Sequence, residues 1–169
     1  MAERASLRDY QRSLSARLRA AETAQSASRL GVQVGGEAWL VDLVDAGEII
    51  PVPPITSVPL TRHWFTGLAN IRGNLYSVVD FSAFLGGRPV TLAEEARLLL
   101  VAERHRMATA LLVDRSLGLR APAQLQLRAN GSIAAPWIKA EYSSADGAVW
   151  KELDVPELVR DPRFLDVTA

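Results

Sequence analysis

The sequence predicts a mostly β protein built from two similar small subdomains. Short apolar stretches alternate with polar residues and are separated by turn residues at a spacing typical of barrels and sandwiches. One pattern also occurs twice: a glycine turn, an apolar strand, an aspartate and a short helical segment follow Gly73 and again Gly147. We therefore expect two β-subdomains, each closed by a helical turn.

The first 29 residues differ from the rest of the chain. Ser6 and Asp9 resemble a capping box. An apolar stripe at helical spacing consists of Leu7, Tyr10, Leu14, Leu18 and Ala21, and arginines lie on the other face. We expect a helix over about 6–24 and a polar link to residue 29. Such a helix either docks on its own domain or serves as a handle for a partner.

Three hairpins are expected after residue 30. The first turns at Gly35-Gly36, the second at about Arg104 to Arg106, and the third at Asp146-Gly147. Four prolines between residues 51 and 59 indicate an irregular connection after the first hairpin.

The repeated pattern predicts two short helices, at about 80–86 and 154–160. Asp80 and Asp154 precede them at matching positions, and an aspartate suits a helix N-cap because its carboxylate accepts an otherwise unpaired backbone N–H. Each copy also has an earlier hairpin that ends in two apolar residues and an aspartate, 43–45 in one case and 112–114 in the other. We expect these two segments to be equivalent.

Composition excludes several classes of protein. The 169 residues suffice for one well-filled domain, or for two small ones that share a core. Nineteen basic and nineteen acidic residues cancel, so no net charge favours binding to a phosphate backbone. The absence of cysteine excludes disulfides, zinc fingers and thiol catalysis. No signal peptide or membrane-spanning apolar run is evident, so a cytoplasmic location is expected.

Catalytic patterns are also missing, so we expect a binding protein that is not an enzyme and that holds no cofactor or metal. His63 and His105 are the only histidines, and neither belongs to an H-E-x-x-H pattern. His105 is expected to be exposed at its hairpin tip. Composition alone leaves a Ser-His-Asp triad open, but no G-x-S-x-G or G-K-[ST] sequence supports a nucleophile or a phosphate loop. The alternative is a barrel that binds single-stranded nucleic acid. It would need aromatic residues on a basic groove, whereas the aromatic residues of this sequence are scattered and its net charge is zero.

One stretch carries a resemblance to a known family. Residues 67–81, GLANIRGNLYSVVDF, resemble the signature of CheW-like domains, G-x-x-N-[LIV]-R-G followed by a strand, an apolar residue and Asp. The flanks agree at AGEIIPV (46–52) and LLVD (111–114), and the resemblance covers about 30–160. We place the domain at 30–165 and a tail at 166–169. The extra N-terminal helix and the closing FLDVTA are most similar to family members of type IV pilus (twitching) systems.

The resemblance implies two intertwined five-stranded SH3-like barrels that share a core. It implies an adaptor without chemistry, which couples the cytoplasmic tip of a methyl-accepting chemoreceptor to the regulatory domain of a CheA-type histidine kinase. A role in flagellar chemotaxis is the alternative to twitching. The partner-binding positions that it implies are Glu48, Gly67, Asn70, Arg72, Gly73 and Ala110.

These positions differ in what their chemistry suggests. Arg72 can hold a carboxylate or helix-end carbonyls of a partner bidentately; alternatively it forms an internal bridge to Glu48 or Asp80 that locks the two subdomains. Asn70 suits a turn better than a contact. Gly67 and Gly73 indicate backbone that excludes a Cβ. The resemblance places Ala110 near a kinase-facing surface.

Overall fold

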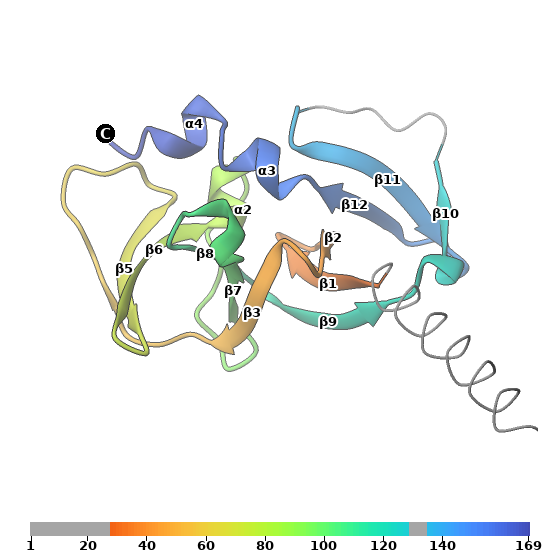
Figure 1. Ribbon diagram of the computed structural model, residues 1–169, viewed down its shortest axis with the longest axis horizontal. Coiled ribbons are helices and arrows are strands. Elements are labelled where there is room, and N and C mark those ends of the chain that lie inside the picture. Colours follow the sequence, from red (N-terminus) through yellow and green to blue (C-terminus); the bar gives the residue numbers. More distant parts are fainter. Residues whose placement is uncertain (1–27, 129–134) are drawn as a thin grey trace, which may run out of the picture.

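Two curled sheets lie side by side in the computed structural model, which describes residues 28–128 and 135–169 (Figure 1). The expected helix at 6–24 falls outside the described residues. Sheet A has the strand order β10-β11-β12-β2-β1-β9, and sheet B has the order β3-β7-β8-β6-β5-β4. Each sheet has five strands of five to seven residues and one shorter edge strand. The predicted architecture, mostly β with two SH3-like subdomains, is confirmed.

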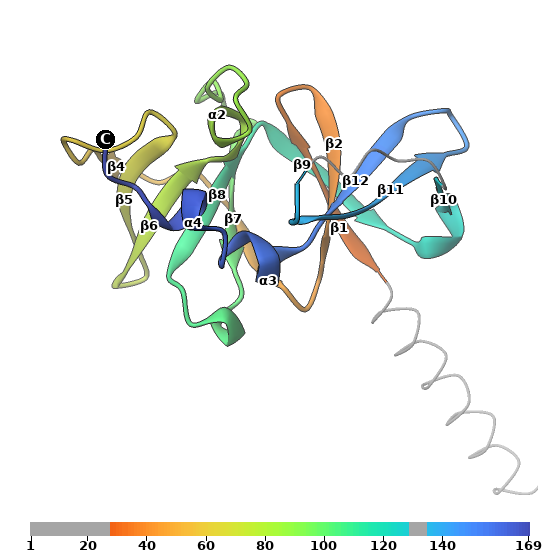
Figure 2. The ribbon, with the colours of Figure 1, turned by 90° about the horizontal axis from the view of Figure 1, so that it is seen from above.

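The strands of the two sheets alternate in blocks along the chain. Those of sheet A are β1 (Arg29–Val34), β2 (Glu37–Asp42), β9 (Arg115–Arg120), β10 (Leu125–Leu127), β11 (Ile138–Ser144) and β12 (Val149–Leu153). Those of sheet B are β3 (Ala46–Pro51), β4 (Ile55–Thr56), β5 (Phe65–Ile71), β6 (Asn74–Asp80), β7 (Arg97–Val101) and β8 (Thr109–Val113). The chain therefore starts sheet A, builds all of sheet B, and returns to complete sheet A (Figure 2).

The sheets share one spatial arrangement of strands, with a single parallel pair in each, although the chain visits the equivalent strands in a different order. In sheet B, β6 runs parallel to β8, with Val79 opposite Leu111; in sheet A, β12 runs parallel to β2, with Leu153 opposite Val41. Val41 and Leu111 are therefore equivalent positions. The expectation that each copy of the repeat is preceded by its own hairpin is wrong for the first copy, because the hairpin that ends at 112–114 lies in sheet B beside β6 and follows it in the chain, whereas the hairpin that ends near 43–45 lies in sheet A beside β12. The two segments are equivalent with a shift of one residue, since residue 44 corresponds to residue 114.

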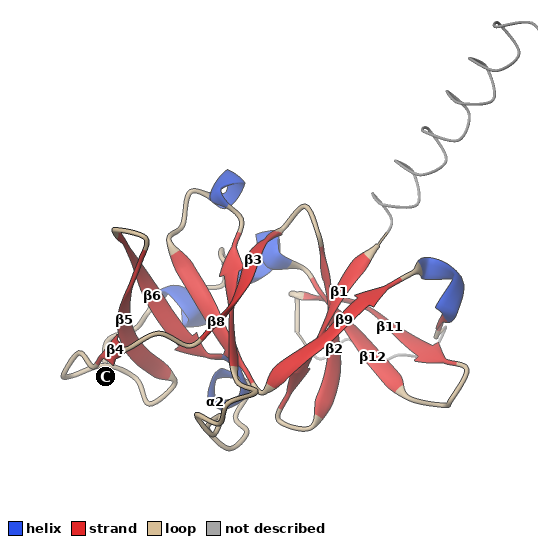
Figure 3. Ribbon diagram, turned by 90° about the horizontal axis from the view of Figure 1, so that it is seen from below, coloured by secondary structure: helices blue, strands red, loops and turns tan. Residues whose placement is uncertain are grey.

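The turns and most short helices agree with the prediction (Figure 3). Gly35 and Gly36 both have positive φ and form the two-residue turn between β1 and β2. The second hairpin turns through the 3-10 helix η1 (Glu103–His105). Helix α2 (Phe81–Phe84) and helix α3 (Val155–Leu158) follow the two strands of the repeat.

An aspartate precedes each α-helix in the part of the chain that the structure describes. Asp80 Oδ1 accepts a hydrogen bond from Ala83 N at 2.9 Å at α2, and Asp154 Oδ1 accepts one from the backbone at α3. Helix α4 (Pro162–Leu165) was not predicted, although Asp161 followed by proline is a typical helix start. The 3-10 helix η2 (Pro122–Gln124) joins β9 to β10.

Alternate residues of the central strands fill two apolar cores. Residues such as Trp39, Phe81 and Leu111 form the core shared by the two sheets. Leu98, Leu112 and their neighbours fill the interior of sheet B. Strand β8 is buried along its whole length because its residues face these two cores in turn. Each fully buried side chain of this kind stabilises the fold by about 1.5–3 kcal/mol.

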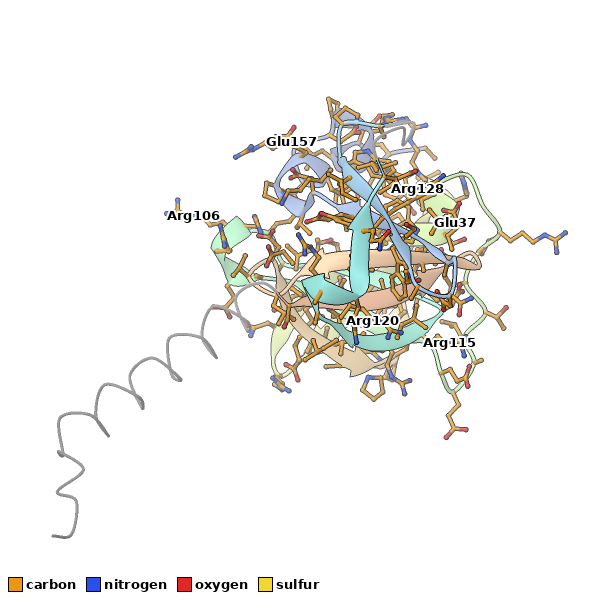
Figure 4. The ribbon with its side chains drawn as sticks, turned by 90° about the vertical axis from the view of Figure 1, so that its right-hand side faces the viewer. Glu37, Arg106, Arg115, Arg120, Arg128 and Glu157 are labelled. Atoms are coloured by element: carbon orange, nitrogen blue, oxygen red, sulfur yellow. The ribbon has the colours of Figure 1, made fainter. Side chains whose placement is uncertain are left out.

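The interior of sheet A contains a carboxylate that the sequence did not reveal. Glu152 of β12 is 1% exposed; it accepts hydrogen bonds from Arg29 Nε at 3.0 Å and Tyr142 Oη at 2.7 Å. Lys139 Nζ lies 3.3 Å from it. Burial raises the pKa of Glu152, but these hydrogen bonds and positive charges outweigh burial and leave the pKa below its usual value. Figure 4 views this end of the molecule, where Arg120 stacks over Trp150 at 4.9 Å.

Candidate partner-binding site

A strained hairpin turn presents Arg72 to solvent. Strands β5 and β6 are joined by the two-residue turn Arg72-Gly73, and Ile71 pairs with Asn74 across it. Both turn residues have positive φ, 52° at Arg72 and 84° at Gly73, as a type I′ turn requires. Asparagine or glycine would adopt this conformation more readily than arginine. An arginine held there is a reason to look for a function.

Asn70 supports this turn. Its side-chain Oδ1 accepts a hydrogen bond from Gly73 N at 2.9 Å, and its own φ is not positive. Asn70 therefore belongs to the turn as expected, through a side-chain hydrogen bond.

Arg72 and Glu48 form a bidentate ion pair. Arg72 Nη1 donates to Glu48 Oε2 at 2.8 Å, and Nη2 donates to Oε1 at 2.7 Å. The hydrogen bond to Glu48, and then the charge of that carboxylate, raise the pKa of Arg72 above its usual value. The Arg72 side chain is 73% exposed and that of Glu48 is 40% exposed. Water reaches the pair, so a partner can reach it too.

The position of Glu48 depends on the curl of sheet B. Glu48 follows an irregularity in the pairing of β3 with β7, and β3 is the opposite edge of sheet B from the β4–β5 side. The ion pair thus spans the open side of the curled sheet. A cavity of about 380 Å³ lies against it, lined by Ile71, Tyr76 and Leu100 among others.

The alternative of a lock between the subdomains is wrong in one respect. The internal bridge from Arg72 to Glu48 exists, but both residues belong to sheet B. Asp80 is not involved, because its carboxylate accepts hydrogen bonds from Ala83 N and from Val90 N at 2.7 Å.

Gly67 lies in β5 of the same hairpin, where the backbone leaves no room for a side chain. It lies at an irregularity in the β5–β6 register with φ of 140°, and a Cβ there would be 2.1 Å from the carbonyl oxygen of Thr56 in β4. Gly67 is buried, so its role is to allow β4 to approach and not to contact a partner. The expectation of a backbone that excludes a Cβ is confirmed.

Ala110 is not on a surface, which corrects its expected place among partner-binding residues. It is 0% exposed in β8, opposite Val78 of β6 and Leu100 of β7. Its side chain belongs to the interior of sheet B, where only a small residue fits among larger neighbours. Any effect of Ala110 on a partner would have to act through the shape of the sheet.

The side chain of His105 is also buried, contrary to the expectation of an exposed hairpin tip. Its side chain is 8% exposed, and Nε2 lies 2.8 Å from Asp45 Oδ1. The 3-10 turn folds back so that the tip of the β7–β8 hairpin contacts the turn between β2 and β3. This contact ties sheet B to the connection that enters it from sheet A.

Within residues 28–128 and 135–169, no group of three or more His, Asp or Glu side chains is placed to hold a metal ion. Over the same residues, no helix is long and apolar enough to span a membrane.

Comparison with known proteins identifies the family. The family model of the CheW-like domain matches residues 29–163. The chain belongs to the CheW-like domain family. In this CheW-like chain, the stretch 67–73 forms the end of β5 and the Arg72 turn, so the signature coincides with the strained hairpin and its ion pair.

Individual relatives differ in how much they share with this CheW-like chain. Protein PilI of Pseudomonas aeruginosa is 34% identical over 99 residues, which cover 59% of this chain and 55% of PilI. Chemotaxis protein CheW of Thermotoga maritima is 29% identical over 99 residues, covering 58% of this chain and 64% of that protein. The aligned part thus spans between half and two thirds of either relative.

A solved structure supports the fold. The scaffolding protein TtCheW from Thermoanaerobacter tengcongensis superposes with a TM-score of 0.63, over 76% of this chain and 88% of that one. The sequence identity is 16%, so this likeness concerns the fold alone.

Proposed function

We propose that the protein is a non-catalytic adaptor that couples a chemoreceptor to a CheA-type histidine kinase. The observation that carries the proposal is the exposed Arg72–Glu48 pair on a strained turn within the family signature. A planar guanidinium in this position can exchange or share its carboxylate partner with helix-end carbonyls or acidic side chains of a receptor. The bidentate contact with Glu48 holds the Arg72 side chain in one direction before a partner arrives.

We further propose that the pathway controls type IV pili and twitching motility. The 34% identity to PilI, against 29% to the Thermotoga CheW over the same length, supports this choice over flagellar chemotaxis. Deleting the gene in its own organism and measuring twitching zones and swimming rings separates the two. Loss of swimming with normal twitching would favour the flagellar alternative.

A nucleic-acid function has no support in the arrangement of aromatic side chains. Binding of single strands uses exposed aromatic platforms. All four tryptophans are buried, with at most 6% of their surface exposed.

The adaptor proposal is tested by charge reversal at Arg72. Because the side chain is exposed and outside both cores, we expect Arg72→Glu to leave the melting temperature within about 2 °C of the wild type. Binding to the receptor tip should weaken about tenfold or more, since reversal adds repulsion to a lost bidentate contact. Thermal melting and a receptor and kinase pull-down are measured on the same preparation.

Arg160→Glu provides a matched control. Arg160 is also 73% exposed and pairs with a glutamate, Glu157, but lies beside α3. It should bind both partners like the wild type. The double variant Glu48→Arg with Arg72→Glu restores an ion pair with the two charges exchanged. If this variant binds the partners again, the pair acts by holding the turn. If binding is not restored, the positive charge of Arg72 faces the partner. Undiminished binding by Arg72→Glu at normal stability would refute the proposed site.

A further inference from the structure

A concave surface at the end of sheet A shares no lining residue with the cavity beside Arg72. It has a volume of about 470 Å³ and lies where η2 joins β9 to β10, on the side of the molecule that faces the viewer in Figure 4. We call it the Arg120 pocket, and define it by Arg120, Gln124, Leu125, Ala145 and Asp146. These residues come from sheet A and its connections, so the pocket belongs to one subdomain.

The interior of sheet A is charged where the interior of sheet B is apolar. The parallel pairs match β12 with β6 and β2 with β8, so that Glu152 occupies the place of Val78 and Arg29 that of Leu98. Both residues of sheet B are 0% exposed and belong to its apolar core. In sheet A the two charges satisfy each other, since Arg29 Nε donates to Glu152 Oε1 at 3.0 Å.

Arg120 adds a second positive charge to this interior. It pairs with Arg29 across β9 and β1, as Ile50 pairs with Leu98 across β3 and β7, so Arg120 stands where sheet B has an isoleucine. The one carboxylate of these three interior positions already faces Arg29. One positive charge therefore has no counter-ion, although Arg120 is partly buried and buried charges are normally paired.

Among the described residues, no oxygen accepts a hydrogen bond from Arg120. Its guanidinium lies over the ring of Trp150, with Cζ 4.9 Å from the ring centroid. This stacking uses the face of the guanidinium, whereas the N–H donors lie in its plane. Nε is buried and unpaired. Nη1 and Nη2 are also unpaired but are not buried, so they are the atoms that a ligand in the pocket can reach.

Asp146 on the rim of the pocket does not neutralise Arg120. Its Oδ1 accepts hydrogen bonds from Ser144 Oγ and from Ala148 N. The hydrogen bond from Ser144, and then that from Ala148, lower the pKa of Asp146, and the charge of Arg120 adds only the smallest contribution. Asp146 therefore stays ionised and repels a second negative charge at the rim. The pocket thus favours a ligand with one negative charge over a phosphate.

An accessible guanidinium edge beside apolar side chains describes a site for a carboxylate. Nη1 and Nη2 of an arginine can hold both oxygens of a carboxylate, as Arg72 does with Glu48 in the other sheet. Leu125 and Ala145 supply accessible apolar surface, and the volume suits a small molecule. We propose that the Arg120 pocket binds a small organic monocarboxylate with an apolar body. This site is separate from the one that carries the adaptor proposal.

The test is an NMR titration of the full-length, ¹⁵N-labelled protein, which follows the indole N–H of Trp150 and the Nε–H of Arg120. The probe is hexanoate, and hexanamide is a control of the same shape without the charge. We expect hexanoate to move both signals with a dissociation constant of about 1 mM. Hexanamide should bind about tenfold more weakly or less, because it lacks the charge-assisted contact. The indole signal of Trp137, in the core shared by the sheets, should stay in place.

The variant Arg120→Met removes the charge, and the equivalent Ile50 indicates that an apolar side chain is compatible with this position. It should weaken hexanoate binding about tenfold or more. Arg115→Met is the matched control, because Arg115 lies on the same strand, outside the pocket, where its Nε donates to Gln33 Oε1. It should bind hexanoate like the wild type. So should Arg72→Glu, and failure of the adaptor test at Arg72 would leave this result unchanged.

Four results would overturn the proposal. The first is that the Trp150 and Arg120 signals stay unmoved at hexanoate concentrations well above about 1 mM. The second is that hexanamide binds as well as hexanoate, and the third is that folded Arg120→Met does so like the wild type. The fourth is binding of acetyl-Ala-Ala-Leu through its free C-terminal carboxylate where hexanoate has no effect, which would make the pocket a docking site for a protein C-terminus. All but the third are read on the wild-type protein, so they stand even where Arg120→Met fails to fold.

Discussion

The buried carboxylate of Glu152 should contribute measurably to stability, and the variant Glu152→Gln tests this. Glutamine keeps the shape and one acceptor, but it removes the negative charge opposite Arg29 and Lys139. Breaking a fully buried ion pair costs about 3–5 kcal/mol. The cost should be lower here because the Arg29 side chain is 19% exposed and that of Lys139 is 53% exposed, so water partly hydrates both charges. We expect a loss of about 2 kcal/mol in the free energy of unfolding at pH 7.

The pH dependence gives this prediction a sign. The pKa of Glu152 is lower in the folded protein than its ordinary value of 4.5. A carboxyl group with a depressed folded pKa binds a proton more readily in the unfolded chain, so its contribution to stability is complete above the unfolded pKa and disappears as the pH falls through the folded pKa. The difference between wild type and Glu152→Gln should therefore be largest near neutral pH and shrink below about pH 4.5.

Urea titrations followed by tryptophan fluorescence, at several pH values from 7 down to the acid limit of the fold, measure this difference. Glu157→Gln removes the same charge from an exposed pair and should change stability little. A Glu152→Gln protein as stable as the wild type at pH 7 would refute the reasoning. So would a difference that grows as the pH falls.

Two further predictions concern the backbone and the N-terminal segment. Gly67→Ala should destabilise by several kcal/mol or prevent folding, because a Cβ would overlap the carbonyl of Thr56, whereas Gly73→Ala meets open space and should lose only about 1 kcal/mol from its left-handed φ. Equal losses in urea titrations would contradict the steric argument. Deleting residues 1–24 should leave a folded but less stable domain, since the predicted stripe offers a few apolar side chains worth about 1.5–3 kcal/mol each if covered. Unchanged stability of the shortened chain would mean that this segment does not dock.

The features that could be predicted from the sequence depend on neighbours along the chain. Glycine pairs such as Gly35-Gly36 specify their turns locally, and an aspartate such as Asp80 caps the helix that immediately follows it. The equivalence of the two subdomains was predictable because the repeat preserves the spacing from turn to strand to cap. Locating Arg72 required only the family signature and its flanking glycines.

The errors concern positions whose environment is set by distant segments. His105 is buried by Asp45, 60 residues earlier. Ala110 is enclosed because β8 pairs on both edges and is covered on both faces, by strands and core residues that lie elsewhere in the chain. Glu152 is surrounded by side chains from strands that are neighbours in sheet A but far apart in the sequence, such as Arg29, which is 123 residues from it. No local pattern distinguishes that glutamate from a solvated one.

The interleaved order of the strands has a consequence for how the protein folds during synthesis. All six strands of sheet B lie between residues 46 and 113, so sheet B can close while the ribosome is still making the rest of the chain. Sheet A cannot, because Arg29 meets Glu152 only across 123 residues of sequence. The newly made β1–β2 hairpin must therefore wait, with Trp39 and Val41 protected only by a finished sheet B, until β12 emerges. Sheet B is then the template on which sheet A is completed, and a chain that stalls before residue 149 would leave the first hairpin without its parallel partner.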